Sequence, residues 1–388
     1  MGEIETLFII LGLVYLAECC LPADKNALIF SPAPFAQRLR SGATITLRSV
    51  LILLNPIPLF ATATVCHPAP VSLSAKGVVL CNSLVHDRAH LRPPGENFIA
   101  YADIVRLESG KDGRLHINDR DFFCGGTEQA TQLASDIGRL AALSKTPLYA
   151  GAALDKAMEN ELRALFSRRL DAEAAAARQR EVFWRTLPTA VLGTLLCVYL
   201  FAVAPAVMLL SSSSKLWLIM ALGLLGLHVL VVLCFWLAHR RLYPAAGEER
   251  LKKLLTMSCN PFASMGSPAL LTRNGLTAFH PMIVGFTLLR GRVRREFMHR
   301  AWARLTYNTF PNYGDAEAHD QLAMHNRLFM SEAARHLSAR GAATEELLLR
   351  PPRDSSAHSY CPICLIQYTV DHGECLYCLG VPVQLMKR

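Results

Sequence analysis

The sequence predicts an α+β membrane protein: a transmembrane helix hairpin, a small β-rich cytosolic domain closed by one helix, a mainly helical region and a C-terminal cysteine module. Hydrophobic residues make up 52% of the 388 residues and charged residues only 18%, whereas soluble domains contain about 25% charged residues. Two uncharged runs, 186–214 and 216–238, each exceed the roughly 20 residues that cross a bilayer core. Two CxxC pairs lie near the C-terminus.

The N-terminal region contains two further apolar stretches. Residues 1–21 predict a transmembrane helix, because the acidic Glu3 and Glu5 do not suit a cleaved signal peptide. Residues 22–66 predict a linker followed by an interfacial or re-entrant segment, 49–66, which contains Asn55 and two prolines. The alternative is that residues 49–66 are a further membrane span, which the charge rule disfavours.

Residues 67–146 predict a small α+β domain. Short apolar runs are separated by Gly and Asp, and the GKDG turn at 110–113 indicates a hairpin. Apolar residues then recur at helical spacing behind Thr127. This order of elements resembles a small bacterial pleckstrin-homology-like domain, which implies a binding or scaffolding module without catalysis. Another small α+β domain is the open alternative.

Residues 147–185 predict a charged stalk helix with Met158, Leu162, Leu165 and Phe166 on one side. Residues 186–239 predict the transmembrane hairpin. Both flanks of the hairpin are rich in Arg and Lys, while its turn contains a single Lys215. The positive-inside tendency therefore predicts a multi-pass protein of the cell (inner) membrane, with the bulk of the chain and the C-terminus in the cytosol. The layout resembles that of uncharacterised bacterial membrane proteins. His228 within the second helix is either a neutral packing residue, which we favour, or part of a functional site.

Residues 240–345 predict a helical cytosolic region. Its most basic stretch, Arg290–Arg304, has apolar residues interleaved with arginines. In a chain of formal charge +9 that contacts a lipid bilayer, this stretch predicts binding to anionic headgroups. The alternative partner is nucleic acid, bound through Arg292, Arg294 and Arg295.

Residues 346–388 predict a linker and a metal module. Cys361, Cys364, Cys375 and Cys378 form two CxxC pairs, and each pair can direct two sulfurs at one ion. The pattern resembles a zinc ribbon, although Leu365 stands where many ribbons have Gly. It predicts one structural Zn²⁺, because four thiols leave no open position and a reducing cytosol disfavours disulfides. His372 is a possible substitute ligand.

The sequence contains no phosphate-binding, dinucleotide-binding, GxSxG or HExxH motif. We therefore predict no catalytic or cofactor-binding residues, and a non-enzymatic membrane protein with a scaffolding, regulatory or protein-binding function, its partner reached through the ribbon. One alternative is a membrane-bound enzyme or transporter component, whose site would lie between the hairpin and cytosolic residues such as His280, His299 or Asp315. The other alternative is a membrane-tethered nucleic-acid binder.

Overall fold

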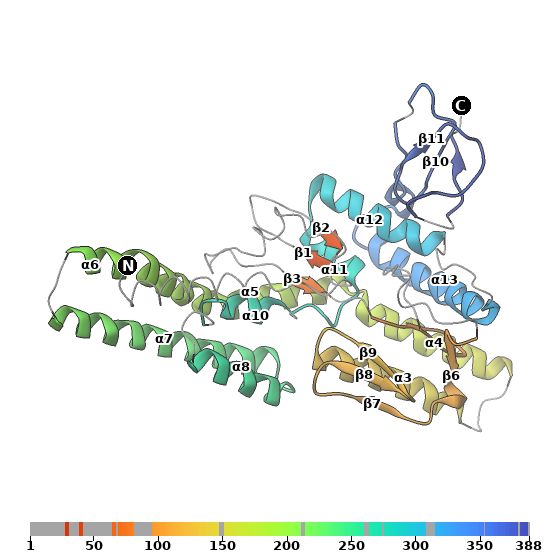
Figure 1. The fold of residues 1–388 in the computed structure, drawn as a ribbon. Helices are drawn as coiled ribbons and strands as arrows, with labels where there is room; N and C mark the ends of the chain where they lie inside the picture. Colours follow the sequence, from red (N-terminus) through yellow and green to blue (C-terminus); the bar gives the residue numbers. More distant parts are fainter. Residues whose placement is uncertain are drawn as a thin grey trace. The chain divides into compact units, whose positions relative to one another are not determined.

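The chain divides into two compact units in the computed structural model (Figure 1). Unit 1 comprises Met1–Cys66 and Ala176–Thr277, and unit 2 comprises His67–Ala175 and Ala278–Arg388. The predicted helix at 1–21 and nearly all of segment 49–66 lie outside the described residues. The structure describes residues 28–30, 39–41, 64–66, 69–80, 95–146, 151–210, 214–259, 264–273, 275–307, 315–352, 354–378 and 381–386.

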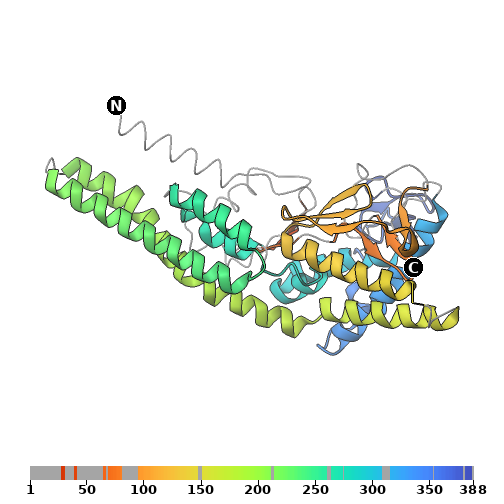
Figure 2. The same ribbon diagram turned by 90° about the horizontal axis from the view of Figure 1, so that it is seen from below.

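Two long helical stretches form the hairpin of unit 1. The first runs through α5 (Ala172–Val198), the π-helix η4 (Tyr199–Val203) and α6 (Ala204–Leu210), and the second is α7 (Ser214–Leu242). They lie side by side (Figures 1 and 2) and are joined where the Tyr199 hydroxyl donates to the Met220 carbonyl at 2.8 Å. The described chain thus contains two helices long and apolar enough to cross a membrane, as the sequence predicts.

The outer surface of these two helices is apolar. Soluble proteins rarely expose large contiguous apolar patches, and larger ones are typical of surfaces that contact another protein or a membrane. The exposed large apolar side chains include Val191, Leu195, Val198, Phe201, Leu218, Ile219, Leu222, Leu225, Val229, Leu230, Leu233 and Leu237.

Two shorter helices pack against the basic end of the hairpin. They are α8 (Gly247–Cys259) and α10 (Ser267–Arg273). Met257 and Leu271 from them are buried in one cluster with Val182, Phe235 and Ala238 of the hairpin. Unit 1 also contains a three-stranded antiparallel sheet in the order β2-β1-β3, made of Leu28–Phe30 (β1), Leu39–Ser41 (β2) and Thr64–Cys66 (β3).

Unit 2 begins with two three-stranded antiparallel sheets. The first, in the order β4-β5-β6, comprises Ser72–Leu73, Gly77–Val79 and Phe98–Ala100. After the 3₁₀ helix η3 (Tyr101–Asp103) comes the second, β7-β8-β9, with Leu107–Ser109, Arg114–Ile117 and Arg120–Phe123. The predicted hairpin is present, since β7 and β8 are joined through the glycine turn, where Gly113 has φ +79°.

The predicted helix after these strands is also present as α3 (Thr127–Ser144). Its apolar side is fully buried, as are Leu115 and Ile117 of β8. Period-3.6 spacing on the helix and alternation on the strand place these side chains in one core. The buried α3 residues are Ala130, Leu133, Ile137 and Leu140.

The helices of unit 2 come from two distant parts of the chain. They are α4 (Ala152–Arg169), α11 (Pro281–Leu288), α12 (Gly291–Thr306) and α13 (Ala316–Ser338). Phe166 of α4 meets Phe329 of α13 edge-on at 5.5 Å between ring centroids. Arg163 donates to Glu332 at 2.9 Å. The predicted apolar side of the stalk, Met158, Leu162, Leu165 and Phe166, is therefore buried within unit 2.

A small sheet completes unit 2 after the 3₁₀ helix η5 (Thr344–Leu347). Its antiparallel strands β10 (Ser359–Tyr360), β11 (Gln367–Tyr368) and β12 (Gln384–Leu385) follow the order β11-β10-β12. Residues 359–385, referred to below as the ribbon, contain all four cysteines of the predicted metal module.

Gly285 lets α11 pack closely on α12, because a Cβ at this position would overlap the ring of the buried Phe297. We expect Gly285→Ala to lower the free energy of unfolding by about 1–3 kcal/mol, as overpacking does in other cores. The measurement is thermal unfolding of the detergent-solubilised chain, followed by Trp fluorescence.

Gly138→Ala in α3 is the matched control. Its added Cβ would make an ordinary 3.7 Å contact with Leu107 Cδ2 and overlap nothing. Because Ala has a higher helix propensity than Gly, the free energy of unfolding should stay unchanged or rise by up to about 1 kcal/mol. Equal stability of the two variants would contradict the tight α11–α12 contact.

Candidate metal centre

Two short turns bring the four cysteines together. Cys361 directly follows β10, and its turn closes where Leu365 N–H donates to the Cys361 carbonyl at 2.9 Å. Leu365 has φ +64°, a conformation that favours glycine. The departure from the usual ribbon pattern at this position therefore coincides with a strained backbone. Cys375 begins the second turn, and its N–H donates to the Val381 carbonyl at 2.8 Å.

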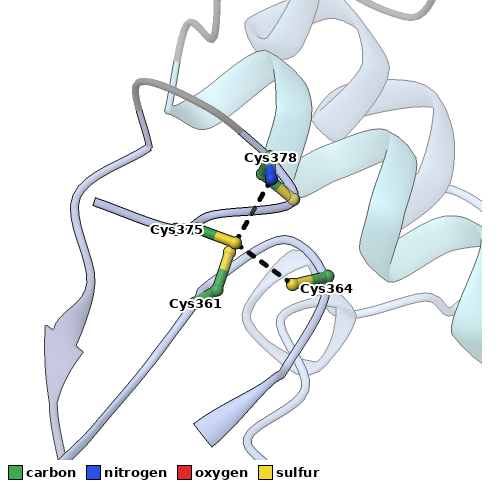
Figure 3. A group of neighbouring side chains, drawn as sticks. All are labelled: Cys361, Cys364, Cys375 and Cys378. Atoms are coloured by element: carbon green, nitrogen blue, oxygen red, sulfur yellow. Dashed lines mark hydrogen bonds between the residues drawn. The ribbon is translucent and has the colours of Figure 1, made fainter. Parts of the chain in front are cut away.

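The sulfur atoms of Cys361, Cys364, Cys375 and Cys378 all lie within 4.8 Å of one another (Figure 3). Those of Cys364 and Cys375 are 3.6 Å apart. Sulfurs about 2.3 Å from a tetrahedral ion would be about 3.8 Å apart, so the observed separations fit a four-thiolate shell. The donor set and its spacing can therefore hold a metal ion.

Hydrogen bonds to sulfur orient the ligands. The backbone N–H of Ile363 donates to Cys361 Sγ at 3.4 Å, and that of Cys378 donates to Cys375 Sγ at 3.2 Å. The Tyr368 hydroxyl donates to Cys375 Sγ at 3.1 Å. Donors that surround a sulfur stabilise its thiolate form, which is the form that binds metals.

The thiols compete for negative charge. A hydrogen bond from Cys378 lowers the pKa of Cys361 to about 5, and donating that bond raises the pKa of Cys378 far above its ordinary value. Burial raises the pKa of Cys364 to about 11. Four thiolates this close repel one another, and a divalent cation is the simplest group that permits all four to ionise.

Helix α12 covers the buried side of the cluster. Ala303 of α12 is fully buried together with Cys361, Ile363, Cys375 and Val381. Gln384 of β12 donates to the Tyr307 hydroxyl, at the end of α12, at 2.7 Å. The cysteine module is therefore packed into unit 2.

Two basic side chains of α12 lie near the cluster. His299 is 2% exposed, and its Nδ1 accepts from the Leu349 N–H at 3.0 Å, which fixes the linker against the helix. Burial lowers the pKa of His299. Arg304 lies close enough to Cys378 for their charges to interact. The sequence does not identify these two residues as neighbours of the cysteine cluster. Nothing in a basic helix indicates which distant segment packs on it.

The residues considered for an enzymatic site have separate structural roles. His280 begins α11 and accepts from the Met282 N–H at 3.3 Å, and burial lowers its pKa to about 3. Asp315 begins α13, where it accepts from the Ala318 N–H at 3.2 Å and from the backbone N–H groups of Gly95 and Asn97. Among the described contacts, His280, His299 and Asp315 do not contact one another.

The remaining candidate histidines differ in environment. His372 is exposed and does not belong to the cysteine cluster. His228 is 8% exposed, and its ring nitrogens lie 3.1 Å from Ser264 Oγ and 3.4 Å from the Ser258 carbonyl. The uncharged sequence around these serines could have indicated that they pack on the hairpin.

The basic stretch is only partly a surface. Of the apolar side chains interleaved with its arginines, Phe297, Trp302 and Leu305 are buried in unit 2 and Val293 is half-buried. Arg292 pairs with Glu296 at 2.6 Å, and Arg294 lies over the Phe286 ring at 5.2 Å. Contact with headgroups or nucleic acid would therefore involve arginines rather than interleaved apolar residues.

The cluster predicts about one bound metal ion per chain, and chelation should loosen the ribbon from α12. We expect faster amide hydrogen exchange across 359–385 after chelation, and loss of metal in the Cys361→Ser, Cys375→Ser variant. Cys259→Ser, at an exposed cysteine of unit 1, is the control and should retain the metal. A double variant with full metal content, measured by elemental analysis, would contradict the assignment.

Comparisons with protein-family models, curated proteins and solved structures find no match for this chain. They give no support to the resemblance of residues 67–146 to a pleckstrin-homology-like domain. Functional assignment therefore depends on the residues of the chain and their geometry.

Proposed function

We propose that this chain is a non-enzymatic integral membrane protein whose unit 2 contains one structural Zn²⁺ and presents the ribbon to a protein partner. The observation that carries the proposal is the closed set of four cysteine sulfurs within 4.8 Å. A site that takes all four ligands from protein leaves no position for substrate or water, so its role is to stabilise structure.

Zinc is the ion that best matches this donor set. Soft thiolate ligands select zinc, copper(I) or iron over magnesium and calcium, and a tetrahedral four-sulfur site suits zinc or iron. Zinc has no redox chemistry, so it also suits a site whose role is structural.

The membrane anchor is inferred from the apolar surfaces of α5–α6 and α7. Arg240 and Arg241 follow the apolar part of α7, and Arg178, Arg180 and Arg185 precede that of α5, while Lys215 alone lies at the other end. This distribution supports a cytosolic location for unit 2. A reducing cytosol in turn keeps the four thiols available for zinc.

The partner surface is inferred from the second metal turn. Leu376 and Tyr377, between Cys375 and Cys378, are 76% and 74% exposed. A metal-fixed turn presents these side chains without the entropic cost of ordering a loop, and exposed aromatic residues are common interface anchors. We refer to Leu376 and Tyr377 as the ribbon tip.

Anionic headgroups are a second proposed contact. Arg292, Arg295 and Arg300 are exposed on α12. Such arginines gain about 1 kcal/mol each near an anionic membrane surface, which would complement the membrane anchor.

The test is affinity capture from solubilised membranes with the full chain as bait. We expect the Leu376→Ser, Tyr377→Ser variant to lose protein partners that the wild-type chain captures, with zinc content unchanged. Val370→Ser is the matched control, because Val370 is also in the ribbon and 53% exposed, and it should retain them.

Identical partners for the tip variant and the wild-type chain would refute the proposed surface. Binding of nucleic acid that weakens steeply with salt and disappears on replacing Arg292, Arg294 and Arg295 would favour the nucleic-acid alternative.

A further inference from the structure

We propose that α8 (Gly247–Cys259) and α10 (Ser267–Arg273) are the two arms of a re-entrant segment, in which α8 descends into the bilayer beside α7 and α10 returns to the same side, with an apolar stripe of α8 in contact with lipid chains. This proposal rests on the membrane anchor proposed above. It adds a lipid-embedded element that hydropathy alone does not identify, because α8 begins with charged residues.

The sequence of the segment has charged ends and an uncharged middle. Charged residues occupy 248–250 and 252–253, no charged residue occurs from Leu254 to Thr272, and Arg273 follows. The uncharged part is too short to cross a bilayer core twice, since one helical crossing takes about 20 residues. Charges at both ends suit a segment that enters and leaves on one side.

Contacts with His228 show how far the segment extends along α7. His228 is the middle residue of α7, 14 positions before Leu242, which corresponds to about 21 Å of helix. Its ring reaches Ser264 Oγ at 3.1 Å and the Ser258 carbonyl at 3.4 Å. If α7 spans the membrane, these serines lie near the bilayer midplane.

The beginning of α8 lies much closer to the basic end of α7. Glu249 and Lys253 interact electrostatically with His239, 11 positions after His228. Lys253 also pairs with Glu249 at 2.6 Å. The charged turns of α8 are therefore level with the interface, where ionised groups remain solvated.

Packing holds the segment against the hairpin on both of its arms. Met257 of α8 is buried against Phe235 and Ala238. Met265, two residues before α10, is fully buried with Leu196, Leu200 and Val231. A helix lying flat at the interface could not make these contacts.

An apolar stripe runs along the outward face of α8, beside the exposed polar residues Lys252, Thr256 and Ser258. Leu251 and Leu255 are 58% and 59% exposed, and Cys259 is exposed one turn further. These positions are spaced four residues apart and form one stripe. The end of this stripe formed by Leu255 and Cys259 lies at the same depth as the apolar side chains exposed on α7. We therefore assign lipid hydrocarbon as the neighbour that covers the stripe.

Two polar side chains at this depth are satisfied internally: His228 of α7, and Thr256 of α8, whose hydroxyl donates to the Lys252 carbonyl at 3.0 Å. Both ring nitrogens of His228 have partners, and a polar group in hydrocarbon is tolerated when it is satisfied internally. His228 therefore acts as a positioning residue that ties α8 and Ser264 to α7.

The test measures depth in the full chain reconstituted into lipid nanodiscs. A fluorescent amino acid is placed singly at Leu255, at Leu251, at Leu230 on α7 and at Val105 in unit 2, which is 93% exposed. Each probe is quenched in turn by lipids brominated at mid-chain and by aqueous iodide. We expect lipid quenching at Leu255 comparable to that at Leu230, weaker lipid quenching at Leu251, and only iodide quenching at Val105.

The alternatives give different results. Iodide quenching at Leu255 with lipid quenching at Leu230 would overturn the re-entrant segment while leaving the membrane anchor intact. A Leu255 probe quenched by neither agent would show that a second copy or another protein covers the stripe, and would also overturn it. Iodide quenching at Leu230 would refute the membrane anchor itself.

Discussion

The close approach of four cysteine sulfurs, whose mutual repulsion a bound cation would relieve, is the constraint on which the C-terminal part of unit 2 depends. The ribbon has few buried apolar side chains of its own, chiefly Ile363 and Val381, which share their cluster with Ala303 of α12. Small zinc domains gain roughly 10–16 kcal/mol from their ion. Metal binding would therefore determine the fold of the ribbon. It would also maintain the contact of Tyr307 with the ribbon and that of His299 with the linker.

The parts of the chain governed by local rules could be predicted from the sequence. Two CxxC pairs, the glycine turn at 110–113, the apolar periodicity behind Thr127 and the uncharged runs all reappear as the expected elements. In each case a short-range requirement, such as metal geometry or the spacing of a helical face, determines the local structure.

Long-range packing could not be predicted in the same way. The apolar side of the stalk pairs with α13, more than 150 residues later, and α12 buries Phe297 and Trp302 while it covers the cysteines. Nothing local to the basic stretch distinguishes a core side chain from a lipid-facing one. Leu365 is an intermediate case: the sequence shows that it departs from the usual ribbon pattern, but only the structure shows its positive φ.

The coordination shell of the metal tests the account most directly, because both the closed site and the non-enzymatic function depend on it. X-ray absorption at the zinc edge of the purified full-length chain should give four sulfur neighbours at about 2.3 Å. A shell that contains nitrogen or oxygen, or fewer than four sulfurs, would open a position at the ion and contradict a purely structural site.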